Sequence, residues 1–526
     1  MRFRAGSGGP RTYWAKELWV TFEGPRGLRF RVSGFWDGGR TWKVRFAPPE
    51  AGRWSWRSES TDAEMDGLEG QFQCAERRSR APVCRHGPLQ VSQDRRHLVH
   101  ADGTPFFWLA DTGWCLLQEL DVPRARAYAR LRAEQGFSAV QVVGIMARRF
   151  EGSDGEIRRG CLLANARGHA ACTVSEKGLV PNPPFYKHVD ALLRELQKAG
   201  LLIAMLPHWG FLANAYLMLH HVRGFFQRGD VPIFYREDGT RYARYIGARY
   251  GAFLPVWVLG GDVRAETDEQ MEYWRTVARS LDEGSGMRLL RTYHPLGHYS
   301  SSEWLHDESW LDFNMVQSGH SIDNTNAYSL TGSDFERSPT KPIINGEPCY
   351  ENIAHRLSPS EQKRIDAQQV RKAFFWSVLS GAVSGHTYGA NNGLQFAPAG
   401  TFYGVEVADW LTNVRTYPGA IQLGKIAQFW RSLPWWLLRP APDLIAADEN
   451  PETGAHVVAA RTQDGQLTLV YIPQPNVYQP ALGALAEGRN TYWFNPRSAK
   501  LSPASDLRAP SSEDWLFVAS RTKLGA

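Results

Sequence analysis

The chain has 526 residues, with 60 Lys and Arg against 54 Asp and Glu, which gives a formal net charge of +6. No block of like charge stands out, so this balance gives little support for binding to nucleic acid or to a membrane surface. No apolar stretch is long enough to span a bilayer. The first residues lack the apolar core of a secretory signal, which fits a soluble cytoplasmic protein or an exported one whose leader has been removed.

From residue 106 onward, strand-like runs alternate with amphipathic helical stretches. The helical stretches cover residues 123–135, 184–200, 267–283 and 358–380, and the last of these offers a capping-box start at Ser358. The eight strand-like runs cover residues 106–110, 137–143, 201–206, 256–262, 287–294, 312–317, 341–347 and 382–389. Eight strands that alternate with helices predict a (β/α)8 TIM barrel, an α/β fold.

The barrel leaves material at both ends, because 526 residues are too many for one hydrophobic core. Short alternating runs separated by Gly- and Pro-rich turns are typical of β-sandwiches, and they occur both before and after the barrel. We therefore expect an N-terminal β-sandwich at residues 1–85, a catalytic barrel at 86–440 and a C-terminal β-sandwich at 441–526.

Two carboxylates follow apolar runs that read as buried parallel strands. Asp262 comes after Gly260 and Gly261, and Glu347 comes after Asn345 and Gly346. Active sites of such barrels lie at the carboxyl ends of the strands, and glycine at these places indicates backbone crowded against a ligand. Glycoside hydrolysis needs a carboxyl group that donates a proton and a second one that attacks the sugar or activates water. Asp262 and Glu347 are therefore the predicted catalytic pair.

Further polar and aromatic residues stand near the predicted strand ends. The chain has 20 Trp, and flat aromatic faces stack on the C–H surfaces of sugars, while amides, imidazoles and guanidinium groups bond to hydroxyls. The residues expected to bind substrate are Asp111, Trp114, Gln141, His208, Trp209, Arg291, Tyr293, His294, Gln317, His320, Tyr350, His386 and Tyr388.

Two other functions stay open. The histidines at strand ends would also suit a metal-dependent barrel hydrolase, although no His-Glu-x-x-His stretch occurs and the six cysteines lack the paired spacings of a zinc site. A noncatalytic carbohydrate-binding protein on an enzyme scaffold is the second alternative. No glycine-rich phosphate loop follows a strand, so we expect no nucleotide cofactor, and no metal in the sugar hypothesis.

The barrel sequence resembles the apiosidase family of glycoside hydrolases. The resemblance is carried by residues 106–114, 186–190, 257–262, 293–295, 316–320, 341–351 and 386–389. It extends to a preceding β-sandwich through residues 34–54 and to a C-terminal domain sometimes labelled collagen-binding. Members of the family release the branched pentose apiose from plant glycans or apiosylated glycosides. The resemblance implies a catalytic aspartate after strand four and a glutamate after strand seven, here Asp262 and Glu347. By analogy with other retaining barrels, the glutamate would be the nucleophile and the aspartate the general acid/base. Another pentofuranose, such as arabinofuranose, is the alternative sugar.

Overall fold

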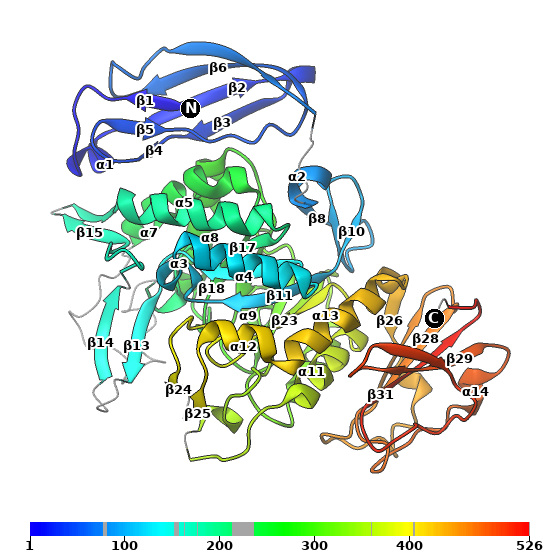
Figure 1. The fold of residues 1–526 in the computed structure, drawn as a ribbon. Coiled ribbons are helices and arrows are strands. Elements are labelled where there is room, and N and C mark those ends of the chain that lie inside the picture. Colours follow the sequence, from blue (N-terminus) through cyan, green and yellow to red (C-terminus); the bar gives the residue numbers. More distant parts are fainter. Residues whose placement is uncertain are drawn as a thin grey trace.

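A computed structural model describes residues 1–76, 82–151, 157–162, 164–175, 177–212, 236–358, 360–402 and 405–524. Its centre is a curved sheet with the strand order β19-β18-β17-β12-β11-β23-β22-β21-β20 (Figure 1). All of these strands pair in parallel except β20 (Tyr299–Ser300), which runs antiparallel to β21. The eight parallel strands are β11 (Trp108–Gly113), β12 (Ala139–Val143), β17 (Leu202–Leu206), β18 (Val256–Gly260), β19 (Arg291–His294), β21 (Asn314–Gln317), β22 (Ile343–Glu347) and β23 (Gly385–Tyr388).

The sheet is nearly closed on itself. The remaining gap lies between β19 and β21, where the Asp312 amide donates to the Arg291 carbonyl at 3.0 Å and the Thr292 hydroxyl donates to the Phe313 carbonyl at 2.7 Å. Seven of the eight predicted runs contain a whole parallel strand, and the run at 106–110 overlaps the first part of β11, so the predicted barrel is confirmed. Several of these strands, such as β17 and β18, are continuous apolar runs because both of their faces are buried, which made them recognisable in the sequence.

Helices cover the outside of the barrel: α4 (Val122–Glu134), α5 (Pro183–Lys198), α7 (Arg236–Tyr250), α8 (Asp268–Ser285), α10 (Asn326–Phe335), α11 (Ala367–Leu379), α12 (Trp410–Thr416) and α13 (Pro418–Arg431). The expected capping box at Ser358 is wrong. Helix α11 begins later, where Asp366 accepts hydrogen bonds from the amides of Gln368 and Gln369 and forms the capping box itself. Asp is as good an N-cap as Ser, so the pattern alone could not choose between the two sites.

The N-terminal region consists of two antiparallel sheets, one with the order β1-β5-β4 and one with the order β3-β2-β6-β7. Their strands are β1 (Arg2–Arg4), β2 (Leu18–Glu23), β3 (Arg29–Ser33), β4 (Phe35–Trp36), β5 (Thr41–Lys43), β6 (Gly52–Ser60) and β7 (Glu69–Cys74). This region lies over α5, α7 and α8 (Figure 1). The fully buried Arg249 of α7 connects the two parts, since it donates to Asp37 of the N-terminal region at 2.9 Å and to Asp190 of α5 at 3.0 Å.

The C-terminal region is a continuous antiparallel sheet with the order β26-β27-β28-β31-β29-β30. Its strands are β26 (Leu438–Pro440), β27 (Val458–Thr462), β28 (Leu467–Ile472), β29 (Asn490–Asn495), β30 (Lys500–Pro503) and β31 (Trp515–Ser520). One face packs on α11 and α13, where Phe494 stacks on Phe429 with ring centroids 4.1 Å apart. The other face has a small core of its own around Trp493 and Phe517.

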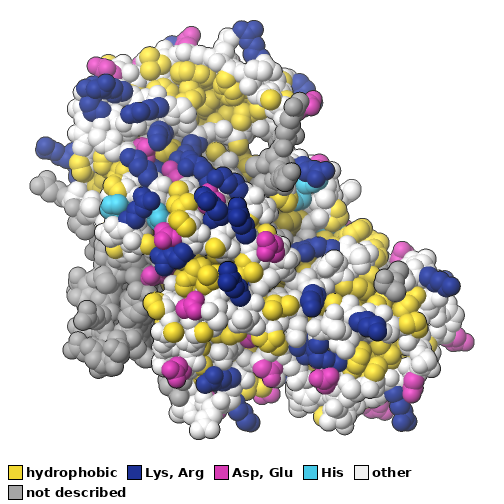
Figure 2. Space-filling model, viewed as in Figure 1, with side chains coloured by type: hydrophobic (Ala, Val, Ile, Leu, Met, Phe, Trp, Pro, Cys, Tyr) yellow, Lys and Arg dark blue, Asp and Glu magenta, His cyan; other side chains and the backbone are white. Residues whose placement is uncertain are grey.

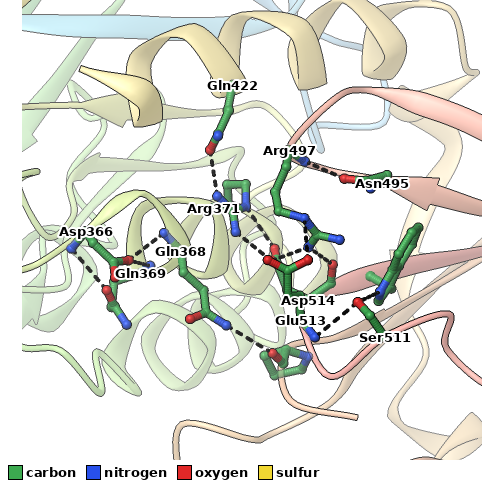
Figure 3. A network of polar contacts seen from close by, with 12 residues as sticks. Asp366, Gln368, Gln369, Arg371, Gln422, Asn495, Arg497, Ser511, Glu513 and Asp514 are labelled. Carbon is green, nitrogen blue, oxygen red and sulfur yellow. Dashed lines mark hydrogen bonds and ion pairs between the residues drawn. The ribbon is translucent and has the colours of Figure 1, made fainter. Parts of the chain in front are cut away.

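A buried ion network joins this sheet to the barrel (Figure 3). Asp514 is fully buried and accepts two hydrogen bonds from Arg371 of α11, at 2.6 and 2.9 Å, and one from Arg497 at 2.9 Å. Gln422 of α13 accepts the remaining bond from Arg371 at 2.6 Å. Because both arginines surround one carboxylate, the sheet is held in a fixed position on the barrel helices.

Two hairpins interrupt the connection between β12 and α5. They are formed by β13 (Ala147–Glu151) with β14 (Ile157–Leu162) and by β15 (Cys172–Ser175) with β16 (Gly178–Pro181).

Charged side chains of both signs are spread over the face of the molecule that Figure 2 shows. Among the helices that the structure describes, none has the length and apolar character needed to cross a membrane.

Candidate active site

Asp262 and Glu347 are brought to the same end of the barrel by two distorted strand ends. At the end of β18, Gly260 and the next two residues, Gly261 and Asp262, all have positive φ, at 79°, 117° and 55°. A Cβ on Gly260 would lie 2.5 Å from the His294 carbonyl oxygen, so glycine is required there. A left-handed aspartate is strained, and such strain collects at functional sites. The turn therefore holds the Asp262 side chain in a set direction.

A bulge in β22 sets the direction of Glu347. Val316 of β21 pairs with Asn345, but the next residue, Gln317, pairs with Glu347, so Gly346 is an extra residue in the strand. Bulges of this kind redirect the side chain that follows. A Cβ on Gly346 would lie 2.4 Å from the Met315 side chain, so a larger residue in the bulge would have to displace Met315.

The two carboxylates lie close together. One ligand atom from each of Asp262, His294 and Glu347 can be chosen so that all three lie within 4.8 Å of one another. Glu347 is 5% exposed, whereas Asp262 is half-buried and is reached by solvent. The pair thus combines a buried carboxylate with one on the accessible side.

Three side chains surround the carboxylate of Glu347. The Tyr350 hydroxyl donates to Oε1 at 2.5 Å, His294 Nε2 lies 2.7 Å from Oε2, and His320 Nε2 lies 3.2 Å from Oε1. Burial by itself would raise the pKa of Glu347, but the two imidazoles beside it outweigh burial and hold that pKa well below its usual range. The pKa of His294 is raised in turn, because the contact with Glu347 outweighs burial. Glu347 is therefore ionised at neutral pH.

Asp262 has the opposite electrostatic environment. Burial, followed by the negative charge of Glu347, raises its pKa from 3.8 to about 6. The side-chain amide of Gln317 donates a hydrogen bond to its Oδ1 at 3.1 Å. A carboxyl with a pKa near 6 keeps its proton for a large fraction of the time at mildly acidic pH. One carboxyl is thus suited to donate a proton and its neighbour to act as a nucleophile.

Aromatic rings form one side of the site. Trp114 and Trp209 lie edge to face with centroids 5.2 Å apart, and both contact the ring of His294, at 5.4 and 5.7 Å. The Trp114 indole donates to the Tyr350 hydroxyl at 2.8 Å, which fixes the group that bonds Glu347. Gln141 donates across the barrel to the Gly346 carbonyl at 2.7 Å and so supports the bulge.

Six residues predicted to bind substrate are directed elsewhere, and the prediction is corrected for them. Asp111 accepts from Arg132 and Tyr128 of α4, and Arg291 donates to Asp282 of α8. The other four contacts are Tyr293 with the Val263 carbonyl, His208 with Tyr273, His386 with the ring of Phe374, and Tyr388 with Glu351. Side chains alternate between the two faces of a strand. All of these residues except His208 lie on strands, and their side chains are on the face that packs against the outer helices.

The sequence analysis did not single out Asn345 and Ser318, whose hydrogen bonds hold the strand end that carries Glu347. Asn345 donates to the hydroxyls of Ser318, at 3.0 Å, and Ser377 of α11, at 2.9 Å, and the Ser318 amide donates to the Glu347 carbonyl at 3.0 Å. The signal was present, since Asn345 interrupts an otherwise apolar strand. A buried amide in such a run indicates a polar network that must be satisfied.

The same carboxylates could also hold a metal ion. Asp262, His294 and Glu347 form the one group of three or more His, Cys, Asp or Glu side chains with metal-site spacing among the residues that the structure describes. The donor set is of a kind that transition metals accept. However, Glu347 Oε1 accepts from Tyr350 and faces His320, so part of its lone-pair capacity is used by protons.

Comparisons with known proteins agree with this geometry. The family model described as "Apiosidase-like, catalytic domain" matches residues 92–437, and a domain of unknown function, DUF5060, matches residues 4–61. A solved glycoside hydrolase is 25% identical, with 84% of this chain and 98% of the other covered and a TM-score of 0.66.

A structure described as a glycoside hydrolase family 5 protein from Bacteroides vulgatus ATCC 8482 is also 25% identical, with coverages of 84% and 95% and a TM-score of 0.67. A third structure, from the same organism and 16% identical, covers 99% of this chain with a TM-score of 0.67, so the fold recurs over the whole length. No curated protein matches. The chain is a glycosidase and belongs to the apiosidase-like family of glycoside hydrolases.

Proposed function

We propose that the protein removes a terminal pentofuranose, apiose by preference, from a plant glycan or an apiosylated glycoside, with retention of configuration. The two roles are supported by the close approach of the two carboxyls and the opposite shifts of their pKa values, with Glu347 lowered and Asp262 raised to about 6, and the choice of apiose is supported by the family match over residues 92–437. Retaining glycosidases hold their carboxyls about 5–5.5 Å apart, whereas inverting enzymes leave room for a water between them. One oxygen of Asp262 lies within 4.8 Å of one oxygen of Glu347, and this close approach supports the first class.

In the first step, a Glu347 oxygen bonds to the anomeric carbon while the bond from that carbon to the leaving oxygen breaks. Asp262 gives its proton to the leaving oxygen, and the product is a glycosyl ester of Glu347. Formation of the ester removes the negative charge that had raised the pKa of Asp262. Asp262 is then a carboxylate that can take a proton from water, whose oxygen attacks the anomeric carbon and releases Glu347 as a carboxylate.

The direct test is incubation with a panel of aryl pentofuranosides and apiosylated natural glycosides, with NMR identification of the released sugar and its anomeric configuration. We expect apiose with retained configuration. Asp262→Asn should lose turnover of alkyl glycosides but should still form the ester with a dinitrophenyl leaving group, which needs no proton. Glu347→Gln should fail with both substrates. Full activity in either variant, or an inverted product, would contradict the proposal.

The two alternatives give different results in the same assay. A metal-dependent hydrolase would lose activity on treatment with a chelator and regain it with zinc or manganese, because Asp262, His294 and Glu347 would have to hold the ion. Cleavage that resists chelation would argue against this alternative. A noncatalytic binding protein would show saturable binding and no released sugar.

A further inference from the structure

The C-terminal sheet carries a hollow of about 470 Å³ on the face turned away from the barrel. Its floor consists of side chains from three adjacent strands. Trp493 of β29 pairs with Ser502 of β30 and with Phe517 of β31, and Asn495 pairs with Lys500. The segment after β30, which contains Asp506 and Arg508, forms one wall.

Two tryptophans in this hollow are held rigidly. The Trp493 indole donates to the Asp506 carbonyl at 2.9 Å, and the Trp515 indole donates to the Ser511 hydroxyl at 3.0 Å. Arg497 stacks over Trp515 with its guanidinium carbon 5.0 Å from the ring centre, and this arginine is anchored in turn on the buried Asp514. A flat ring that is already ordered loses little entropy when a ligand stacks on it.

Two cationic side chains, Lys500 and Arg508, line the hollow. Within the part of the chain that the structure describes, neither the Lys500 ammonium nor the Arg508 guanidinium has a hydrogen-bonded or ion-paired partner, although both line the hollow. Asp506, the acid that lines it, uses Oδ1 to accept from the Arg508 backbone amide at 2.9 Å. The hollow therefore offers positive charge and free donors around aromatic rings.

A larger hollow on the N-terminal sheet shows the contrast. It measures about 630 Å³, but its charges are paired across strands: Arg29 with Glu23 at 3.6 Å and Arg57 with Glu69 at 3.0 Å. The charges of these two arginines are therefore already balanced by glutamates of the same sheet. The two hollows therefore differ in whether the cations that line them are paired.

We propose that the C-terminal hollow is a noncatalytic binding site for a polysaccharide that contains uronic acids. A sugar ring would stack on the exposed part of Trp515, its hydroxyls would bond to Asn495 and Ser502, and its carboxylate would face Lys500 and Arg508. The site goes beyond the proposed reaction, which takes place in another domain. Its effect would be to raise the local concentration of a polymeric substrate near the barrel.

The test uses the full chain in native gels that contain polygalacturonate or neutral arabinan. We expect polygalacturonate to retard the parent protein more strongly than arabinan does. The double variant Lys500→Ala/Arg508→Ala changes two exposed side chains and should raise the Kd for polygalacturonate at least tenfold. Trp515→Ala should weaken binding to both polymers, and its thermal unfolding shows whether the sheet remains folded.

The matched control is Arg29→Ala/Arg57→Ala, which removes the same charge from the N-terminal hollow and should bind like the parent. Turnover of a small aryl glycoside should be unchanged in both double variants, so loss of polymer binding is separated from loss of catalysis. If Lys500→Ala/Arg508→Ala is retarded as much as the parent, or if neither polymer retards the parent, the proposed site is refuted.

Discussion

The raised pKa of Asp262 has a consequence for stability that can be measured. The carboxyl has a pKa of 3.8 in an unfolded chain and about 6 in the folded one, so the folded state binds an extra proton between these values. The free energy of unfolding therefore decreases as the pH rises from about 4 to about 6, and above pH 6 it stays lower by a constant amount. Asparagine has the same shape and carries no charge. Asp262→Asn should stabilise the protein at neutral pH.

The structure bounds the size of this effect. A shift of about two pKa units corresponds to about 3 kcal/mol, at 1.36 kcal/mol per unit. Asp262 is half-buried, so solvent screening lowers the expected gain to about 1–3 kcal/mol. The Gln317 amide can still donate to the asparagine oxygen, so this hydrogen bond does not oppose the gain.

Thermal unfolding at pH 7.5 and pH 4.5 measures the effect. We expect the Tm of Asp262→Asn to exceed that of the parent by a few degrees at pH 7.5 and by much less at pH 4.5, where the folded carboxyl already holds its proton. The exposed Asp307→Asn is the control and should show no such difference. An Asp262→Asn protein no more stable than the parent at pH 7.5 would refute the electrostatic argument.

Three further predictions follow from the same geometry. With an alkyl leaving group, kcat/KM should fall as the pH rises through about 6, because Asp262 loses the proton that it donates, and a dinitrophenyl leaving group should remove this fall in a pH–rate profile. Gly346→Ala should lower kcat about a hundredfold or more with folding retained by circular dichroism, since the added Cβ disturbs the bulge. Tyr350→Phe removes a 2.5 Å hydrogen bond to Glu347, worth about 1.5–3 kcal/mol, and should lower kcat/KM by roughly 10–100-fold, whereas Tyr250→Phe, with its hydroxyl on a backbone carbonyl, should not.

The barrel and its acidic pair could be predicted because both leave local signals in the chain. Strands such as β17 and β18 are apolar along almost their whole length because both of their faces are buried, and the helices between the strands begin after capping residues such as Thr267. Gly260 and Gly261 beside Asp262 have positive φ, which other residues rarely adopt, and Gly346 beside Glu347 is closely covered by the Met315 side chain. Gly260 and Gly346 face atoms at 2.5 and 2.4 Å from the Cβ that they lack.

The inward or outward direction of the other side chains could not be predicted, because it depends on register. Arg291, Tyr293 and His294 occupy one short strand, yet Arg291 and Tyr293 contact helix α8 while His294 reaches Glu347. A shift of one residue would exchange these roles without changing the apolar pattern. The five corrected residues that lie on strands follow from this ambiguity and not from a wrong fold.

The different roles of Asp262 and Glu347 as acid and nucleophile depend on contacts between residues that are far apart in the sequence, so no local pattern predicts them. His294 lies on β19 and His320 follows β21, and they meet Glu347 only when the barrel closes. Their imidazoles outweigh burial and lower the pKa of Glu347, whereas burial and then the charge of Glu347 raise the pKa of Asp262. Loss of either histidine should therefore raise the pKa of Glu347, so that a smaller fraction of this carboxyl is ionised and able to act as the nucleophile at mildly acidic pH.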